Sequence, residues 1–243
     1  MKLIIANTNA TMSKQVADEI THIMQSRKEP LICTASGDSP AGLYREIVDR
    51  VHHQQLDVSR WFFVGLDEWV PMNGNDEGSC RYHLNQQLFN PLQIAGDRIC
   101  FFDGRANDLS KECTKTEQFV ERHGGIDVAI LGLGMNGHIG MNEPGTSAEL
   151  HSHVVDLDPL TQQVGQKYFT KQQKLSKGIT LGIATLMEAR NIVLLISGKH
   201  KAGIARAIIE EDISEKLPGT LLRHHPSLKI YLDEEAAAEI VIG

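Results

Sequence analysis

The chain has 243 residues, of which 41% are hydrophobic and 23% charged, and it carries a formal net charge of −7. These values are typical of a globular protein with a sizeable core, and we expect one domain over residues 1–243. Because the acidic excess comes without clustered Lys and Arg, the composition argues against a nucleic-acid partner. No apolar run approaches the roughly 18 residues that span a bilayer, and the first residues do not resemble a signal peptide. We therefore expect a cytoplasmic protein with no membrane partner.

The first part of the chain predicts two strands, each followed by a helix. Residues 2–6 and 31–35 are short apolar runs, and residues 11–27 and 40–51 have the pattern of helices. The second strand is followed by Ser36-Gly37-Asp38-Ser39-Pro40, which places N–H groups, a glycine and two hydroxyls at a helix N-terminus. Such a site suits an anion, especially phosphate, because the free N–H groups and the helix dipole favour negative charge. An ordinary helix cap beside a turn would give the same sequence, so both interpretations stay open.

A third strand is expected at residues 61–66, and it ends at Asp67 and Glu68. Two acids at the carboxyl end of a buried strand stand where open α/β sheets place their chemistry, although a solvated loop is the commoner setting of an Asp-Glu pair. The elements expected next are a polar loop at 73–79, a helix at 80–88, a strand at 99–101 and a helix at 110–122.

Residues 126–133 predict a strand buried on both faces, and a glycine-rich loop follows it as far as Thr146. Residues 132–137 match the dinucleotide-binding pattern G-x-G-x-x-G. We reject a dinucleotide site here, because that pattern must open a helix and the segment Asn142-Glu143-Pro144-Gly145 interrupts any helix that begins at Gly137.

His138 and Glu143 are the chemically useful side chains of this loop. A lone histidine is more often structural than catalytic, but the neighbouring Gly137 and Gly140 remove bulk around the ring and favour a reachable imidazole. An imidazole beside a carboxylate can exchange protons near neutral pH. From the residues alone we infer an acid/base enzyme that acts on a sugar or acid phosphate.

The last part of the chain continues the alternation of strands and helices. Its expected elements are an edge strand at 151–156, helices at 184–189 and 199–210, and strands at 191–196 and 228–232, whereas residues 157–175 have no clear pattern. The alternation over the whole chain predicts an α/β fold that is Rossmann-like, with three αβα layers, a mostly parallel central sheet and a single domain.

Four cysteines, at positions 33, 80, 100 and 113, lie far apart in this sequence. They form no C-x-x-C pair, and no histidine stands at zinc-finger spacing from them. We expect reduced thiols in or near the core, and we assign no metal site.

The run from Leu131 to Gly145 closely resembles the signature of the glucosamine-6-phosphate deaminases and the related galactosamine-6-phosphate deaminase/isomerases. The resemblance extends over nearly the whole chain, through the segments 36–40, 65–69, 178–182 and 198–202. It implies a hexosamine-6-phosphate deaminase/isomerase domain that turns an amino-sugar 6-phosphate into a ketohexose 6-phosphate and ammonia. It also implies that no cofactor is needed, that the partner is a small sugar phosphate, and that a homo-oligomer is possible.

The same resemblance assigns roles to individual residues. Asp67 would move a proton between C2 and C1 of the sugar, and His138, held by Glu143, would open the pyranose ring. The substrate phosphate would be bound by Ser36, Gly37 and Ser39, with Lys201 supplying positive charge.

Three positions depart from the family pattern. Asn136 stands where some members have aspartate, and an amide can still orient the imidazole. Lys167 stands where an arginine clamps the phosphate in well-studied members, and lysine lacks the bidentate fork of arginine. Asp38 replaces a glycine in the phosphate loop, so we expect its carboxylate to point away from the anion or to weaken its binding.

Two other functions remain as alternatives. A 6-phosphogluconolactonase, which is a hydrolase, would share the fold, the phosphate loop and a Gly-His motif, but that branch lacks the sequence Asn142-Glu143-Pro144. A non-catalytic sugar-phosphate sensor could keep the pocket alone. The segment 160–163 resembles the galactosamine branch more than the glucosamine branch, and the epimer stays open.

Overall fold

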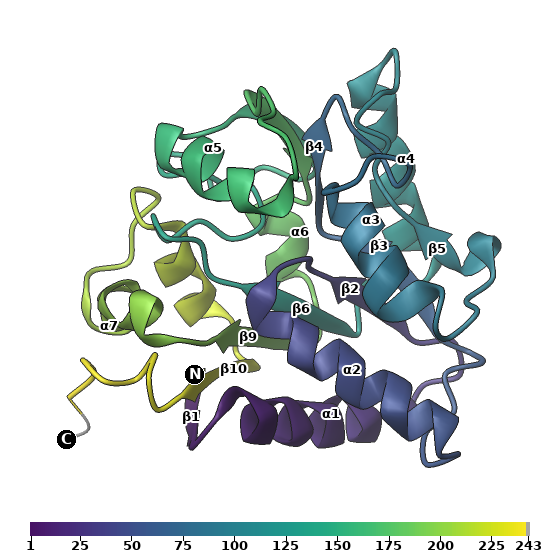
Figure 1. Cartoon of the computed structure of the whole chain (residues 1–243), viewed down its shortest axis with the longest axis horizontal. Helices are drawn as coiled ribbons and strands as arrows, with labels where there is room; N and C mark the ends of the chain where they lie inside the picture. The colour runs from purple at the N-terminus through teal and green to yellow at the C-terminus, as the bar shows by residue number, and fades with distance from the viewer. Residues whose placement is uncertain (242–243) are drawn as a thin grey trace.

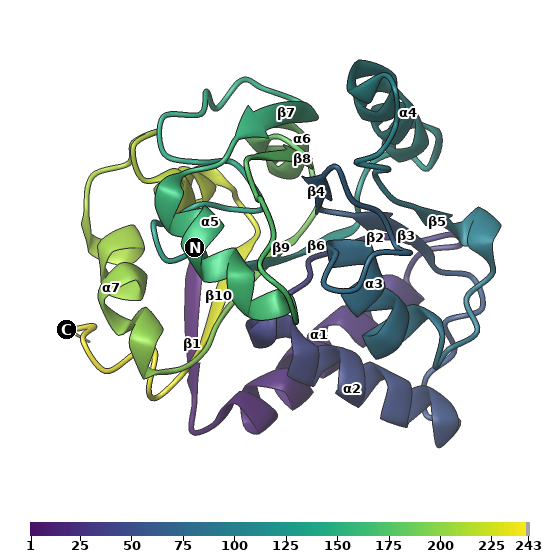
Figure 2. The same cartoon turned by 45° about the horizontal axis from the view of Figure 1, so that its top comes forward.

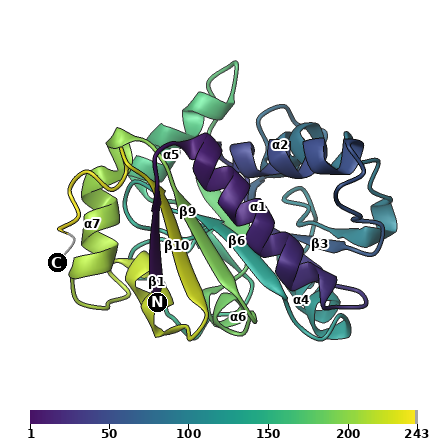
Figure 3. The same ribbon diagram turned by 90° about the horizontal axis from the view of Figure 1, so that it is seen from below.

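The computed structural model describes residues 1–241. In this part of the chain, seven strands form a parallel sheet at the centre of the molecule. They are β1 (Lys2–Ala6), β2 (Leu31–Thr34), β3 (Phe62–Gly65), β5 (Ile99–Cys100), β6 (Val128–Gly132), β9 (Ile192–Ile196) and β10 (Leu228–Asp233). Their order is β1-β10-β9-β6-β2-β3-β5, and every neighbouring pair is parallel. The predicted parallel central sheet is therefore confirmed (Figure 3).

Helices cover both faces of this sheet. The α-helices are α1 (Asn9–Gln25), α2 (Asp38–His52), α3 (Cys80–Leu84), α4 (Leu109–Arg122), α5 (Pro159–Gly165), α6 (Ile183–Met187) and α7 (Ala202–Glu210). Shorter helical turns are η1 (Asn85–Phe89), η2 (Gly96–Arg98), η3 (Gln166–Tyr168), η4 (Lys199–Lys201) and η5 (Pro218–His224). Buried side chains of α1 and α2 form one core with the sheet, and those of α4, α6 and α7 form another, so the three αβα layers are confirmed (Figure 1).

β6 shows why the central strands are unbroken apolar runs in the sequence. Ile130 packs with the core under α1 and α2, its neighbour Leu131 packs with the core on the opposite face, and both are fully buried. Successive side chains of a strand point to opposite faces, so a strand covered on both sides needs apolar residues at every position.

A second sheet, which the sequence pattern does not predict, lies beyond the carboxyl ends of the first. It contains β4 (Asp67–Val70), β8 (Lys177–Thr180) and β7 (His153–Asp156), in the antiparallel order β4-β8-β7. Only β7 was expected as a strand. A single residue, Leu66, separates β3 from β4, and its N–H donates to Thr34 O (3.0 Å) while its carbonyl accepts from Leu181 N (2.9 Å). Leu66 thus joins the two sheets, and Figure 2 shows the strands of the second sheet, β4, β8 and β7, beside one another.

Several predicted boundaries differ from the observed ones. The helix expected at 80–88 consists of α3 followed by the π-helical turn η1, and the helix expected at 199–210 consists of η4 followed by α7. The segment without a clear pattern contains α5. All four cysteines are buried and unpaired, as predicted.

Within residues 1–241, no helix is long and apolar enough to cross a membrane. Over the same residues, no group of three or more His, Cys, Asp or Glu side chains is arranged to hold a metal ion.

Candidate active site

A cavity of about 150 Å³ opens at the carboxyl ends of β2 and β6, between the N-terminus of α2 and helix α5. The carboxyl ends of parallel strands are where open α/β sheets bind their ligands. Of the predicted site residues, the cavity is lined by Ser36, Gly37, Asp38, Ser39, Asp67, Asn136, His138, Lys167 and Lys201. Glu143 is the one predicted site residue that does not line it, because it lies behind His138.

The predicted phosphate loop forms the turn from β2 into α2. Gly37 has φ +125°, a conformation that favours glycine, and α2 begins directly after it at Asp38. Gly37 provides no side chain to cap this 15-residue helix, and residues 36–40 at its start line the cavity. The loop therefore has the geometry of an anion site.

Lys201 and Lys167 bring positive charge to the same cavity. Burial and, to a lesser degree, the charge of Lys167 lower the pKa of Lys201 to about 8, although the charge of Asp38 acts to raise it. Its Nζ donates to Leu133 O at 2.5 Å. Nζ of Lys167 lies 2.5 Å from Oδ2 of Asp38 and over the ring of Tyr168. The Asp38 carboxylate is thus paired with Lys167.

Asp67 is the first residue of β4 and is 9% exposed. Burial raises the pKa of its carboxyl to about 6, although a hydrogen bond from Cys80 and the charge of His138 act to lower it. A carboxylate whose pKa lies this close to neutral can both accept and return a proton.

Glu68, the next residue, has a different role from the one that the Asp-Glu pair implied. It is fully buried, and its carboxylate accepts hydrogen bonds from the backbone N–H groups of Trp69 (2.8 Å), Cys80 (2.9 Å) and Arg81 (3.0 Å). Burial raises its pKa to about 7 against these bonds. Because it does not line the cavity, it serves to anchor the start of α3 to β4.

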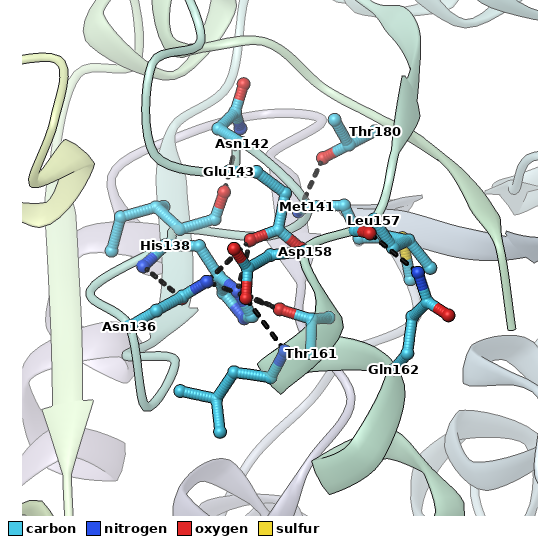
Figure 4. Close-up of polar contacts among 12 residues, drawn as sticks. Asn136, His138, Met141, Asn142, Glu143, Leu157, Asp158, Thr161, Gln162 and Thr180 are labelled. Atoms are coloured by element: carbon cyan, nitrogen blue, oxygen red, sulfur yellow. Dashed lines mark hydrogen bonds and ion pairs between the residues drawn. The ribbon is translucent and has the colours of Figure 1, made fainter.

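His138 lies at the centre of a polar cluster (Figure 4). Its Nδ1 is 3.3 Å from Oε2 of Glu143 and 3.1 Å from Oγ1 of Thr161. Burial raises the pKa of Glu143, but hydrogen bonds from His138, Thr161 and Asn136 and the charge of His138 outweigh it, so the net pKa is below the usual value. The ring lies against Gly134, where an added Cβ would overlap it. This close packing explains the glycine at that position.

The amide of Asn136 contacts the groups on either side of the imidazole ring. Its Oδ1 accepts from the backbone N–H of His138 (3.2 Å), and its Nδ2 donates to Oε2 of Glu143 (2.8 Å). The amide therefore fixes the carboxylate and the backbone on either side of the ring. A carboxylate at this position would instead face Glu143 with like charge.

The loop after β6 does not lead into a helix, as the sequence predicts. No helix follows Gly137; the chain instead turns back, with Ile139 bridged to Asn142. Asn142 is fully buried, and its Nδ2 donates to Ile139 O (2.8 Å) and Leu181 O (2.9 Å). Asn142 thus holds the loop in place, and Glu143 follows it at the correct position to reach His138.

Three residues that line the cavity were not predicted from the sequence as site residues: Thr161, Tyr168 and Cys80. Burial raises the pKa of the Tyr168 hydroxyl, which keeps it a hydrogen-bond donor, and the ring packs edge-on against His83. Thr161 and Tyr168 come from the segment whose pattern was unclear. No periodicity in a single sequence marks a side chain that reaches a site across such a segment.

The sequence and the structure both match known proteins. The family model of glucosamine-6-phosphate isomerases and 6-phosphogluconolactonases matches residues 6–230. A glucosamine-6-phosphate deaminase of Oceanobacillus iheyensis is 35% identical over 241 residues, which cover 99% of this chain and 96% of the relative. A glucosamine-6-phosphate deaminase of Bacillus subtilis is 34% identical and covers 98% of this chain and 99% of its own.

Solved structures agree with the sequence relatives. A monomeric glucosamine-6-phosphate deaminase superposes with a TM-score of 0.94 at 33% identity, covering 98% of this chain and 100% of its own. The 6-phosphogluconolactonase of Trypanosoma brucei superposes with a TM-score of 0.77 at 20% identity, covering 99% of this chain and 98% of its own, and shows the shared fold. The family-model match and the full-length relatives establish that this chain belongs to the family of glucosamine-6-phosphate isomerases and 6-phosphogluconolactonases.

Proposed function

We propose that this chain is an amino-sugar 6-phosphate deaminase/isomerase, which converts glucosamine 6-phosphate or galactosamine 6-phosphate to the ketohexose 6-phosphate and ammonia. The observation that carries the proposal is that one cavity combines an anion site at α2, a buried carboxylate at Asp67 and an imidazole backed by a carboxylate at His138. The full-length relatives named as glucosamine-6-phosphate deaminases support it.

The first chemical step, the opening of the sugar ring, requires a base at the anomeric hydroxyl. Ionised Glu143 can only accept hydrogen bonds, so it favours the tautomer of His138 with the proton on Nδ1. Nε2 is then free to take the proton of the anomeric hydroxyl. Return of that proton to the ring oxygen opens the pyranose to an aldehyde at C1.

The second step, a proton transfer from C2 to C1, requires a base that removes a proton from carbon. The aldehyde at C1 acidifies the proton on C2, and the carboxylate of Asp67 removes it while the ammonium group of the substrate gives a proton to O1, which yields an enolamine. Return of the proton from Asp67 to C1 gives an iminium at C2, which water hydrolyses to the ketone and ammonia, released as ammonium. Asp67 fits both halves of this transfer because burial raises its pKa to about 6.

Phosphate binding would hold the substrate in register for both steps. Ser36, Gly37 and Ser39 at the start of α2 and the ammonium group of Lys201 surround one end of the cavity. Lys167 would add a second positive charge once its ammonium group leaves Asp38 and binds the phosphate. A phosphorylated sugar as substrate is consistent with our expectation of a cytoplasmic enzyme.

A single chain supplies every residue in this scheme, and the relative with the TM-score of 0.94 is described as monomeric. We therefore expect the isolated chain to be active, with or without assembly into a homo-oligomer.

The decisive experiment measures ammonia release from glucosamine 6-phosphate and from galactosamine 6-phosphate by the wild type and by Asp67→Asn. Asparagine keeps the shape but cannot act as a base, so we expect kcat to fall by on the order of 10²-fold or more. The ratio of the two wild-type rates also assigns the epimer.

The same preparation should be given 6-phosphogluconolactone, with acid release as the readout. Lactone turnover as fast as that of the amino sugars would favour the hydrolase instead. Equal ammonia release by the wild type and Asp67→Asn would refute Asp67 as the base, and binding without any turnover would indicate a sensor.

A further inference from the structure

Thr161 contacts the catalytic histidine from an element that is remote in the sequence. It lies in α5, 23 residues after His138, and it is 7% exposed. Its Oγ1 lies 3.1 Å from Nδ1 of His138 and 3.5 Å from Nδ2 of Asn136. The hydroxyl of Thr161 is therefore surrounded by groups of the site (Figure 4).

The helix itself does not use this hydroxyl. Asp158 caps α5 by accepting from the N–H of Leu160 at 2.8 Å. Gln162 ties the helix to the preceding segment by donating from Nε2 to Leu157 O, also at 2.8 Å. Threonine in a helix often bonds the carbonyl four residues earlier, but Thr161 bonds side chains of the site instead. Its hydroxyl is thus free to act on the imidazole.

The direction of the hydrogen bonds follows from the charge of Glu143. Since the ionised carboxylate can only accept, the proton in its contact with Nδ1 of His138 belongs to Nδ1. A lone pair of Thr161 Oγ1 then faces Nδ1 of His138 and accepts its proton. The contact to Glu143 at 3.3 Å is long, and the contact to Thr161 at 3.1 Å is the shorter of the two.

We propose that Thr161 is a positioning residue for His138: its hydroxyl is the second acceptor for the Nδ1 proton and keeps Nε2 unprotonated and turned to the substrate. This inference deepens the proposed function and rests on it for the role of Nε2. It also means that the ring-opening step depends on the position of α5, because this helix brings the hydroxyl of Thr161 to the imidazole ring of His138.

The test compares Thr161→Val, which has the same shape without the hydroxyl, with Thr161→Ser, which keeps the hydroxyl. We expect Val to lower kcat for glucosamine 6-phosphate about tenfold and to leave KM within about twofold, because the phosphate contacts are unchanged. Serine should stay within about threefold of the wild type in both constants. Gln162→Ala is the matched control, since it weakens α5 but leaves both acceptors of the Nδ1 proton in place.

A second readout does not depend on turnover. The tautomer of His138 can be measured from the ¹⁵N signals of its imidazole in the ligand-free protein, with His138→Gln to assign them among the 11 histidines. The form with the proton on Nδ1 should dominate in the wild type and in Thr161→Ser, and its share should fall in Thr161→Val. If the valine variant does not fold, Thr161→Ala takes its place.

An unchanged tautomer together with an unchanged kcat in Thr161→Val would overturn the inference. A loss of kcat that Gln162→Ala reproduces in full would show that Thr161 only stabilises the helix, and would overturn it as well. If the wild type releases no ammonia from either amino sugar, the proposed function fails, and the tautomer measurement alone still decides the role of Thr161.

Discussion

Asp67 and Glu68 are neighbours in the sequence, and the structure gives them opposite roles because successive residues of a strand point to opposite sides. Asp67 lines the cavity, with Cys80 and His138 as the groups that lower its pKa. Glu68 is enclosed by backbone N–H groups at the start of α3. Burial raises the pKa of both acids, but only Asp67 can reach a substrate.

The raised pKa of Asp67 has a consequence for stability. Its folded pKa of about 6 lies above its ordinary value of 3.8, so between these values the folded protein binds more protons than the unfolded chain. The contribution of this group to stability is therefore fully present below pH 3.8 and is lost as the pH rises through 6. A shift of this size corresponds to about 3 kcal/mol at most.

We predict that Asp67→Asn is more stable than the wild type at pH 8, by up to about 3 kcal/mol, because the variant has no buried charge at this position. Near pH 4 the difference should vanish, since the carboxyl is then largely protonated in the folded protein. Denaturant unfolding of both proteins at the two pH values measures this. A wild type that is the more stable protein at pH 8 would contradict the assigned cost of burying the charge.

At the scale of elements, an ion pair joins the start of α2 to η3. Two departures from the family pattern, Asp38 and Lys167, meet in it at 2.5 Å. Both side chains are well exposed, so the pair contributes little to stability. The ion pair affects the cavity instead, because Asp38 neutralises the positive charge of Lys167 and places a negative charge beside the expected phosphate.

We predict that Asp38→Asn lowers KM for the sugar phosphate by about two- to fivefold and leaves kcat unchanged. The substitution frees Lys167 and removes the like charge. The gain should shrink as salt is raised, because exposed charges are screened. Steady-state kinetics at low and high ionic strength measure both effects.

Asp49→Asn is the matched control, since Asp49 is an exposed acid on the same helix far from Lys167. A KM that rises in Asp38→Asn, or that falls equally in Asp49→Asn, would show that the ion pair does not compete with the phosphate.

At the scale of the whole molecule, the site lies where the two sheets meet. Leu66 is bonded to β2 on one side and to Leu181, after β8, on the other. Asp67 follows it on β4, and His138 lies on the loop after β6. The two proposed catalytic groups therefore come from different sheets, and their alignment requires that the sheets stay together.

We predict that the chain unfolds as a single unit. The two tryptophans report on the two sheets, because Trp61 precedes β3 and Trp69 lies on β4, and both are buried. Fluorescence of Trp61→Phe and Trp69→Phe in denaturant should give each remaining tryptophan the same midpoint as the far-ultraviolet circular dichroism of that variant. A separate, earlier transition for Trp69 would mean that the small sheet unfolds independently and would argue against a single domain.

The main sheet and the helices that cover it could be predicted from the amino-acid sequence, as could the strand ends that carry the motif residues. Apolar runs and helical spacing are local properties, and the predicted strands at 2–6, 126–133 and 191–196 all lie in the parallel sheet. The motif residues Asp67 and His138 were placed at strand ends, and parallel strands bring their carboxyl ends to one edge. The residue assignments beyond this geometry remain predictions for the experiments above.

The partners of these residues follow from the fold and not from the sequence pattern. The fold placed Asp67 in the cavity and Glu68 behind it, it turned Asn136 to Glu143 and Asp38 to Lys167, and it brought Thr161 to His138. The small sheet has the same origin, since Gly178 weakens the pattern of β8, which pairs with β4 over 100 residues away. Local patterns carry no record of such contacts, because long-range packing alone determines which side chains meet.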